Sequence, residues 1–256
     1  MQWFVGTLHK FFQRSEPWVF VAALVVVLGV WGLAALTGNV MEGDTTKFDT
    51  AILLAFRQPQ DLNLLAGPGW LLTVVRDATA LGGGLVIGLV LSGTTGFLLL
   101  ARRYHMVVFL LVATLGATGM NYLMKLVISR ARPAVVPHLT DVTSLSFPSG
   151  HSAMSAAVYL TIGALLAQSV KKRRLKLYFV LIALLITGMV GLSRVMLGVH
   201  YPTDVLAGWA SGLAWALLCW IVARYLQRRG AIEKEADPMS EQPPAAESLP
   251  ATEAKL

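Results

Sequence analysis

Residues 177–197 read LYFVLIALLITGMVGLSRVML, and this stretch decides the class of fold. Arg194 is its only charged residue. An α-helix needs about 20 consecutive apolar residues to cross the hydrocarbon core of a bilayer. The stretch therefore predicts a membrane-spanning helix that carries a cation near its carboxyl end.

The composition of the whole chain agrees with a membrane protein. Of its 256 residues, 55% are hydrophobic and 14% are charged, whereas soluble domains average about 25% charged residues. The net charge of +7 would suggest a nucleic-acid partner in a soluble protein, but here cytoplasmic loops rich in Lys and Arg explain it better. Cys219 is the only cysteine, which excludes an internal disulfide and a cysteine-based metal site.

Five further apolar runs predict an all-α, polytopic fold with a six-helix transmembrane bundle. The expected spans are residues 18–38, 79–101, 106–127, 152–170, 177–197 and 204–226. We interpret the first as a retained anchor, because the apolar core of a cleaved signal peptide is usually only about 7–15 residues long. Glycines spaced four apart, at Gly84/Gly88 and Gly208/Gly212, predict close helix packing within the bundle rather than in a dimer.

The distribution of basic residues predicts the orientation. The loops ARRYH (101–105) and KKRRLK (171–176) are short and strongly basic, which favours the cytoplasmic side and places both termini there. We expect a bacterial inner (plasma) membrane location, with the opposite face extracytoplasmic.

Two segments fall outside the expected spans. In residues 39–78, FDTAILLAFR (48–57) and LNLLAGPGWLLTVV (62–75) predict short interfacial helices in the first outer loop. A seventh short span is the alternative, but it would spoil the charge asymmetry. Residues 230–256 are rich in Pro, Ala and Glu and lack aromatic residues, which predicts a disordered tail after a membrane domain of residues 1–229.

Ionisable residues gather where four of the predicted spans meet the outer face, and such residues in a membrane usually mark a functional site. KLVISRARP (125–133) places Lys125 and Arg132 seven residues apart, on one helix face, and Pro133 should end that helix at Arg132. Taken alone, the pair could be cations that reach lipid headgroups.

SFPSGHSAM (146–154) predicts a helix start. Ser149 is a suitable N-cap, and the exposed N–H groups that follow could bind an anion. Gly150 allows close backbone approach, and His151 lies in the first turn. Without further information, this stretch is an ordinary helix cap.

SRVMLGVHYPTD (193–204) ends the fifth span and begins the sixth, with Pro202 in its first turn. Asp204 could accept a hydrogen bond from Nδ1 of His200 and leave Nε2 free as a nucleophile. Alternatively, Asp204 merely complements a helix dipole. The three cations Lys125, Arg132 and Arg194 would repel one another without an anion between them, and a phosphoryl group fits this set.

The three segments, in this order, resemble the signature of the type 2 phosphatidic acid phosphatase superfamily of membrane lipid phosphatases. That signature reads Lys-x6-Arg-Pro, Pro-Ser-Gly-His and Ser-Arg-x5-His-x3-Asp, and it matches residues 125–133, 148–151 and 193–204. The resemblance implies hydrolysis of a lipid phosphate or diphosphate without a metal or other cofactor. It also implies that His200 attacks phosphorus, Asp204 orients it and His151 acts as acid and then base. The implied phosphate-binding residues are Lys125, Arg132, Ser149, Gly150 and Arg194.

The motifs leave several questions open. Undecaprenyl diphosphate, phosphatidylglycerophosphate, phosphatidic acid and a lipid A phosphate are all candidate substrates, and the oligomeric state is undetermined. A lipid phosphotransferase, a vanadate-dependent haloperoxidase-like enzyme and a non-enzymatic transporter or scaffold are the alternatives. We expect no role for His9, His105 and His138. We expect Arg130 to point away from the site unless it meets a second phosphate, and Ser193 either to approach the phosphate or merely to end a helix.

Overall fold

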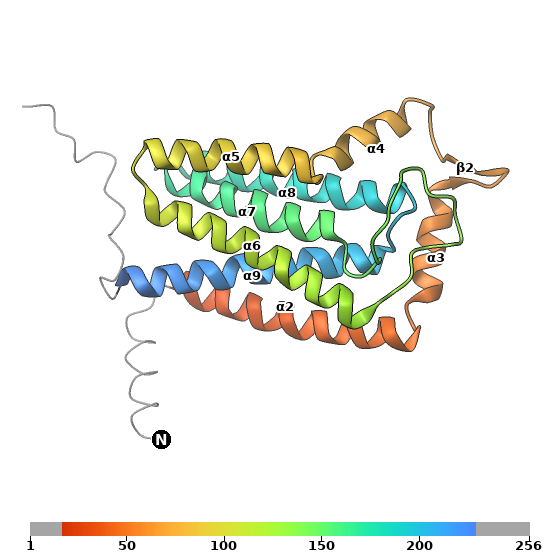
Figure 1. The fold of residues 1–256 in the computed structure, drawn as a ribbon, viewed down its shortest axis with the longest axis horizontal. Coiled ribbons are helices and arrows are strands. Elements are labelled where there is room, and N and C mark those ends of the chain that lie inside the picture. Colours follow the sequence, from red (N-terminus) through yellow and green to blue (C-terminus); the bar gives the residue numbers. More distant parts are fainter. Residues whose placement is uncertain (1–16, 229–256) are drawn as a thin grey trace, which may run out of the picture.

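The computed structural model describes residues 17–228, in which eight α-helices and one β-hairpin follow one another (Figure 1). The elements are α2 (Pro17–Glu42), α3 (Thr46–Ala55), β1 (Arg57–Gln58), β2 (Asp61–Leu65), α4 (Leu71–Ala80), α5 (Gly84–Leu100), α6 (Tyr104–Ile128), α7 (Gly150–Gln168), α8 (Arg173–Met196) and α9 (Pro202–Arg228). The predicted tail, residues 230–256, lies outside the described residues.

Among the described residues, five helices are long and apolar enough to cross a membrane: α2, α6, α7, α8 and α9. By length and composition, α4 and α5, which meet at a bend of 47°, together qualify as a sixth, broken span or as a re-entrant pair. The predicted all-α bundle is therefore confirmed. The second predicted span, 79–101, is shorter as a helix than expected, because residues 81–83 form the bend before α5 begins at Gly84.

Helix α7 lies at the centre of the bundle and packs against α6, α8 and α9, whereas α2 lies outside α9 (Figure 1). Two glycines of α9 permit this contact. A Cβ atom at Gly212 would lie 2.4 Å from the carbonyl oxygen of Ala153, and one at Gly208 would lie 2.6 Å from that of Ser149. The predicted close packing is confirmed for this pair. It is wrong for Gly84 and Gly88, since a Cβ atom at either would meet nothing within 4 Å.

The segment predicted to be the first outer loop covers one end of the bundle with α3, the hairpin and α4 (Figure 1). Helix α3 confirms the helix predicted near residues 48–57. The helix predicted at 62–75 is wrong in its first part, because Asp61–Leu65 pairs with Arg57–Gln58 as an antiparallel hairpin. Gly67 adopts a φ of 137°, which a helix cannot accommodate, so helix α4 begins only at Leu71.

The turn between α8 and α9 lies beneath this cover and is firmly packed. Leu197 and Val199 are fully buried in a cluster with Leu65 of β2 and Val75 of α4. A second cluster joins Leu53 of α3 to residues of α8 and α9. Residues 197–201 are therefore enclosed between the spanning helices and the outer loop.

Helix α6 ends earlier than the sequence predicts. Its last residue is Ile128, and Ser129 follows in the left-handed region with a φ of 47°. Lys125 and Arg132 consequently do not share a helix face, which corrects the argument from their spacing. Arg132 reaches the same end of the bundle through the irregular segment between α6 and α7.

Candidate active site

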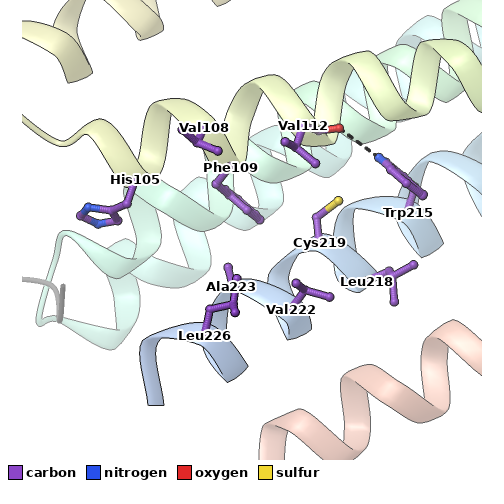
Figure 2. Close-up of a pocket in the computed structure, with 10 residues that line it drawn as sticks. All are labelled: His105, Val108, Phe109, Val112, Trp215, Leu218, Cys219, Val222, Ala223 and Leu226. Atoms are coloured by element: carbon purple, nitrogen blue, oxygen red, sulfur yellow. Dashed lines mark hydrogen bonds between the residues drawn. The ribbon is translucent and has the colours of Figure 1, made fainter. Parts of the chain in front are cut away.

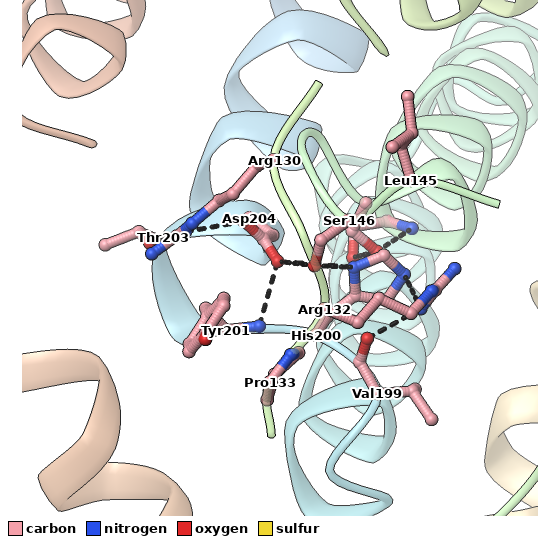
Figure 3. A network of polar contacts seen from close by, with 12 residues as sticks. Arg130, Arg132, Pro133, Leu145, Ser146, Val199, His200, Tyr201, Thr203 and Asp204 are labelled. Carbon is pink, nitrogen blue, oxygen red and sulfur yellow. Dashed lines mark hydrogen bonds and ion pairs between the residues drawn. The ribbon is translucent and has the colours of Figure 1, made fainter. Parts of the chain in front are cut away.

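His200 lies in the enclosed turn between α8 and α9 and is only 2% exposed. Its Nε2 atom is 3.3 Å from Nη1 of Arg132 (Figure 3). A guanidinium can only donate hydrogen bonds, so Nε2 accepts and the ring proton belongs on Nδ1. The contact therefore assigns the tautomer in which the lone pair of Nε2 faces a cation.

Asp204, in the first turn of α9, is fully buried on the other side of the His200 ring. Its Oδ2 atom lies 3.4 Å from Nδ1 of His200, which is longer than a usual hydrogen bond. The same oxygen accepts hydrogen bonds from the Ser146 hydroxyl and from the backbone N–H of Tyr201 at 2.9 Å. Asp204 is thus close enough to orient His200, as predicted, but it is shared with two other donors.

Ser146 is a site residue that sequence reasoning missed. Its hydroxyl lies between the two side chains, bonded to Asp204 and 3.5 Å from Nδ1 of His200 (Figure 3). The signal was its position two residues before Pro148 in the second motif segment. A serine beside a turn is too common to indicate such a role without the fold.

Burial sets the protonation state of His200. It lowers the pKa of the imidazole to about 4, and the positive charges of Arg132 and Arg194 act in the same direction, while Asp204 opposes them. The ring is therefore neutral at neutral pH. A neutral ring with a free lone pair on Nε2 is the form a nucleophilic histidine requires.

Arg132 is held by oxygen atoms that carry no formal charge. Its Nε and Nη2 donate to the carbonyl oxygen (2.7 Å) and the hydroxyl (3.1 Å) of Ser144, and its Nη1 donates to the carbonyl oxygen of Val199 at 2.6 Å. Lys125, on α6, donates from Nζ to the carbonyl oxygen of Leu145. Both cations are therefore bound to the loop that precedes α7.

Arg194, on α8, is 4% exposed and donates from Nη1 to the hydroxyl of Thr79 at 2.9 Å. Its Nε atom is buried and has no hydrogen-bond partner within residues 17–228. In this part of the chain, none of Lys125, Arg132 and Arg194 forms an ion pair with a carboxylate. The three cations thus leave positive charge uncompensated beside His200, as an anion-binding site requires.

The start of α7 contributes the remaining three predicted site residues. Ser149 is the N-cap, as predicted: its hydroxyl oxygen accepts from the hydroxyl of Ser152 at 2.9 Å and from its backbone N–H at 3.5 Å. Gly150 and His151 follow in the first turn, where backbone N–H groups lack helical acceptors. The ring of His151 is half-buried and lies within electrostatic range of Arg194 and His200. All eight predicted site residues therefore gather at one end of the bundle.

Arg130 does not point away from this end of the bundle, contrary to expectation. Its Nη1 donates to Oδ1 of Asp204 at 2.7 Å, and its Nη2 donates to Oδ2 of Asp49 at 2.8 Å. Its guanidinium also lies over the ring of Tyr201, 4.0 Å from the centroid. Arg130 thus forms ion pairs with two carboxylates, whereas Lys125, Arg132 and Arg194 form none with the part of the chain that the structure describes.

The remaining expectations concern Ser193 and three histidines. The hydroxyl of Ser193 donates to the carbonyl oxygen of Val190 at 2.6 Å, within its own helix. His138 is exposed, and its Nε2 contacts the carbonyl oxygen of Pro133 at 2.7 Å. His105 lies about 30 Å along α6 from Lys125, at the opposite end of the bundle. His9 lies outside the described residues.

His105 lines an apolar groove of about 430 Å³ between α6 and α9 (Figure 2). The groove walls include Phe109, Trp215 and Cys219, and Trp215 donates to the carbonyl oxygen of Val112 at 3.3 Å. The groove is remote from the polar cluster and offers no cation or carboxylate among its lining residues. The polar end of the bundle is therefore the candidate active site.

Comparison with known proteins shows similarity to membrane phosphatases. The profile of the PAP2 superfamily matches residues 106–228, from α6 to the end of α9. Phosphatidylglycerophosphatase B of Bacillus subtilis (strain 168) is 34% identical over 181 residues, which cover 69% of this chain and 81% of that protein. Lipid A 1-phosphatase of Rhizobium johnstonii is 35% identical over 109 residues, which cover 39% of this chain and 41% of that protein.

A solved structure extends the similarity to the fold. The transmembrane PAP2-type phosphatidylglycerolphosphate phosphatase of Bacillus subtilis superposes with a TM-score of 0.71 and 28% sequence identity. The alignment covers 79% of this chain and 98% of the other. With a relative of 34% identity matched over most of its length, and the motifs assembled at one site, the chain belongs to the PAP2 superfamily of membrane lipid phosphatases.

Proposed function

We propose that this lipid phosphatase removes the terminal phosphoryl group of a phospholipid through a phosphohistidine on His200, with phosphatidylglycerophosphate as the first substrate to test. The observation that carries the proposal is the contact of Nε2 of His200 with Arg132, among cations that have no carboxylate partner within residues 17–228. An incoming phosphate would supply the missing negative charge. Its phosphorus would then lie within reach of Nε2.

In the first step, the lone pair of Nε2 attacks phosphorus and the bond from phosphorus to the ester oxygen breaks. Protonated His151 donates its proton to the departing oxygen, which leaves as the lipid alcohol. Lys125, Arg132 and Arg194 bind the phosphoryl oxygens, whose charge develops in the transition state, and Ser149 and the N–H of Gly150 assist.

In the second step, neutral His151 takes a proton from water, and the oxygen of that water attacks phosphorus. The phosphorus–nitrogen bond breaks, inorganic phosphate leaves, and His200 returns to its neutral form. Asp204 orients the ring and stabilises its positive charge while the phosphoryl group is attached. Positively charged side chains supply the electrostatic stabilisation in both steps, so we expect the reaction to proceed in EDTA.

The substrate proposal rests on similarity. The relative matched over most of its length is a phosphatidylglycerophosphatase, whereas the lipid A 1-phosphatase is matched over less than half of its length. The side of the membrane rests on charge, since the basic loops 101–105 and 171–176 lie at the opposite end of the bundle from His200. We therefore propose that the site opens at the extracytoplasmic face.

The test is phosphate release by the purified protein from phosphatidylglycerophosphate, phosphatidic acid and undecaprenyl diphosphate in detergent containing EDTA. We expect the highest kcat/KM for phosphatidylglycerophosphate. His200→Ala should lower kcat by at least about a thousandfold, whereas His138→Ala, at an exposed loop histidine, should retain it. Quenching in alkaline detergent with ³²P-labelled lipid should trap a phosphoprotein that is stable to alkali and labile to acid, and only when His200 is present. Full activity of His200→Ala would refute the mechanism, and a higher kcat/KM for another lipid would refute the substrate.

A further inference from the structure

Asp49 of α3 is fully buried although it belongs to the outer loop. Its Oδ1 accepts from the backbone N–H of Thr203 at 3.1 Å, and its Oδ2 accepts from the hydroxyl of Thr203 at 2.7 Å and from Arg130 at 2.8 Å. Arg130 in turn donates to Oδ1 of Asp204 at 2.7 Å. One guanidinium therefore joins a carboxylate of the outer loop to the carboxylate beside His200.

The charges of these three side chains have a consequence for His200. Arg130 paired with Asp204 alone would form a neutral unit next to the imidazole. Asp49 adds a second negative charge, so the buried unit Asp49–Arg130–Asp204 carries one net negative charge. A phosphoryl group on Nε2 makes the ring of His200 cationic, and a buried cation needs a compensating charge nearby.

We propose that Asp49 is a positioning residue of the active site, which fixes Arg130 against Asp204 and supplies the net negative charge that stabilises His200 while it carries the phosphoryl group. This inference rests on the phosphohistidine mechanism proposed above. Neither Asp49 nor Arg130 touches the reacting atoms. Both act through Asp204, whose Oδ1 is held by Arg130 so that Oδ2 faces His200 and Ser146.

The surrounding packing suits a fixed rather than an adaptable arrangement. Leu53, one turn after Asp49 on α3, is buried against Val195 of α8 and Val205 of α9. Tyr201 covers one face of the Arg130 guanidinium and donates its backbone N–H to Asp204. The outer helix α3 is therefore bound both to the turn that carries His200 and to the helix that carries Asp204.

Two variants test the charge that Asp49 contributes. Asp49→Asn keeps the shape and makes the unit neutral, whereas Asp49→Asn combined with Arg130→Gln restores one net negative charge on Asp204. The other ionisable groups that interact with His200 are Arg132, Arg194 and His151, and neither variant changes them. Asp44→Asn, at an exposed carboxylate in the turn before α3, is the matched control.

Two quantities are measured on monodisperse protein in detergent. The first is kcat per amount of protein. The second is the acid limb of kcat/KM, which is the fall of kcat/KM toward low pH between pH 7 and pH 3. Loss of the negative charge makes protonation of His200 harder. Asp49→Asn should therefore lower kcat roughly tenfold and move the acid limb about half a unit to one unit toward lower pH. The double variant should return the limb to its wild-type position and recover part of the kcat lost in Asp49→Asn. A structural role alone would predict greater damage in the double variant and no directed shift of the limb.

The proposal is overturned if Asp49→Asn matches Asp44→Asn in kcat and in its acid limb, or if the double variant is no better than Asp49→Asn. If Asp49→Asn cannot be produced as folded protein, the double variant alone tests the proposal. A reduced kcat together with an acid limb of kcat/KM at its wild-type position supports the proposal. A wild-type kcat or a displaced acid limb overturns it. His200→Ala in parallel separates the two hypotheses. Activity in that variant refutes the phosphohistidine mechanism, whereas its inactivity beside an unaffected Asp49→Asn refutes only the role of Asp49.

Discussion

Nη1 of Arg132 lies 3.3 Å from Nε2 of His200, so a phosphate-binding candidate contacts the candidate nucleophile directly. The same Nη1 also donates to the carbonyl oxygen of Val199, the residue before His200. Arg132 thus contacts both the ring of His200 and the backbone directly before it, and these two contacts fix the position of the imidazole. A phosphoryl group that binds Arg132 would find Nε2 already adjacent.

We expect Arg132→Lys to lower kcat/KM by about a hundredfold, because an ammonium lacks the planar fork that reaches Ser144, Val199 and His200 together. Phosphate release from the preferred lipid is the measurement. Arg76→Lys is the control, since Arg76 is exposed and donates to the carbonyl oxygen of Leu139, away from His200. Equal activity of Arg132→Lys and the wild type would contradict a phosphate-binding role for Arg132.

The lowered pKa of His200 predicts the pH dependence of activity. Burial brings this pKa to about 4, so Nε2 should stay unprotonated down to about pH 4, whereas an unperturbed histidine would protonate near pH 6.5. The acid limb of kcat/KM that belongs to the enzyme should therefore lie well below 6. Titration of the free lipid by ³¹P NMR identifies the limb that belongs to the substrate. If the acid limb that belongs to the enzyme lay near pH 6.5, His200 would not be shielded from water.

The same shift predicts how stability changes with pH. Between about pH 6.5 and pH 4 the unfolded chain binds a proton at residue 200 and the folded chain does not. Stability from this group is therefore complete above pH 6.5 and is lost as the pH falls toward 4. The thermal midpoint in detergent should fall more between pH 7.5 and pH 4.5 for the wild type than for His200→Gln. Parallel curves for the two proteins would rule this out.

Ser146→Ala should lower kcat roughly tenfold while KM changes little, because the hydroxyl fixes Oδ2 of Asp204 beside Nδ1 of His200 and does not reach the phosphate. The comparison is Ser169→Ala, at an exposed serine directly after α7 that donates to the carbonyl oxygen of Leu166 in that helix. Steady-state kinetics of both variants are needed. A change in KM alone would place Ser146 at the substrate instead.

Gly212→Ala should destabilise the bundle, because the new methyl group would lie 2.4 Å from the carbonyl oxygen of Ala153, and a helix backbone cannot move aside without separating α7 from α9. The expected cost is about 1–3 kcal/mol, measured as a lower thermal midpoint in detergent. Gly88→Ala is the matched control, since its methyl group would meet nothing within 4 Å. A similar midpoint for the two variants would show that α7 and α9 are not held this closely.

The sequence predicted the spans and the cluster of site residues for different reasons. Spans such as 177–197 are long, and hydropathy alone identifies them. Lys125, His151 and Asp204 belong to motifs whose residue types match phosphate chemistry. The hairpin at Arg57–Leu65 is too short for its pattern to be distinguished from an interfacial helix.

Asp49 and Ser146 could not be predicted in the same way. Asp49 lies 155 positions before Asp204 in the sequence, and only the packing of α3 against α9 brings it near Arg130. Ser146 becomes distinctive only because the loop before α7 places its hydroxyl against Asp204. Roles that depend on such tertiary contacts leave no local pattern in a single sequence.

The bend before α5 has a consequence for the surrounding lipid. Helix α5 contains 17 residues, so it is about 25 Å long, and the hydrocarbon core of a bilayer is about 30 Å thick. Gly82, in the bend, packs against His151, where a Cβ atom would lie 3.2 Å from that side chain. A membrane crossing by α5 alone would therefore be too short, and local thinning of the bilayer is one way in which such a hydrophobic mismatch is accommodated. The headgroup layer would therefore dip beside His151, and a lipid phosphate could enter the site without its acyl chains leaving the bilayer.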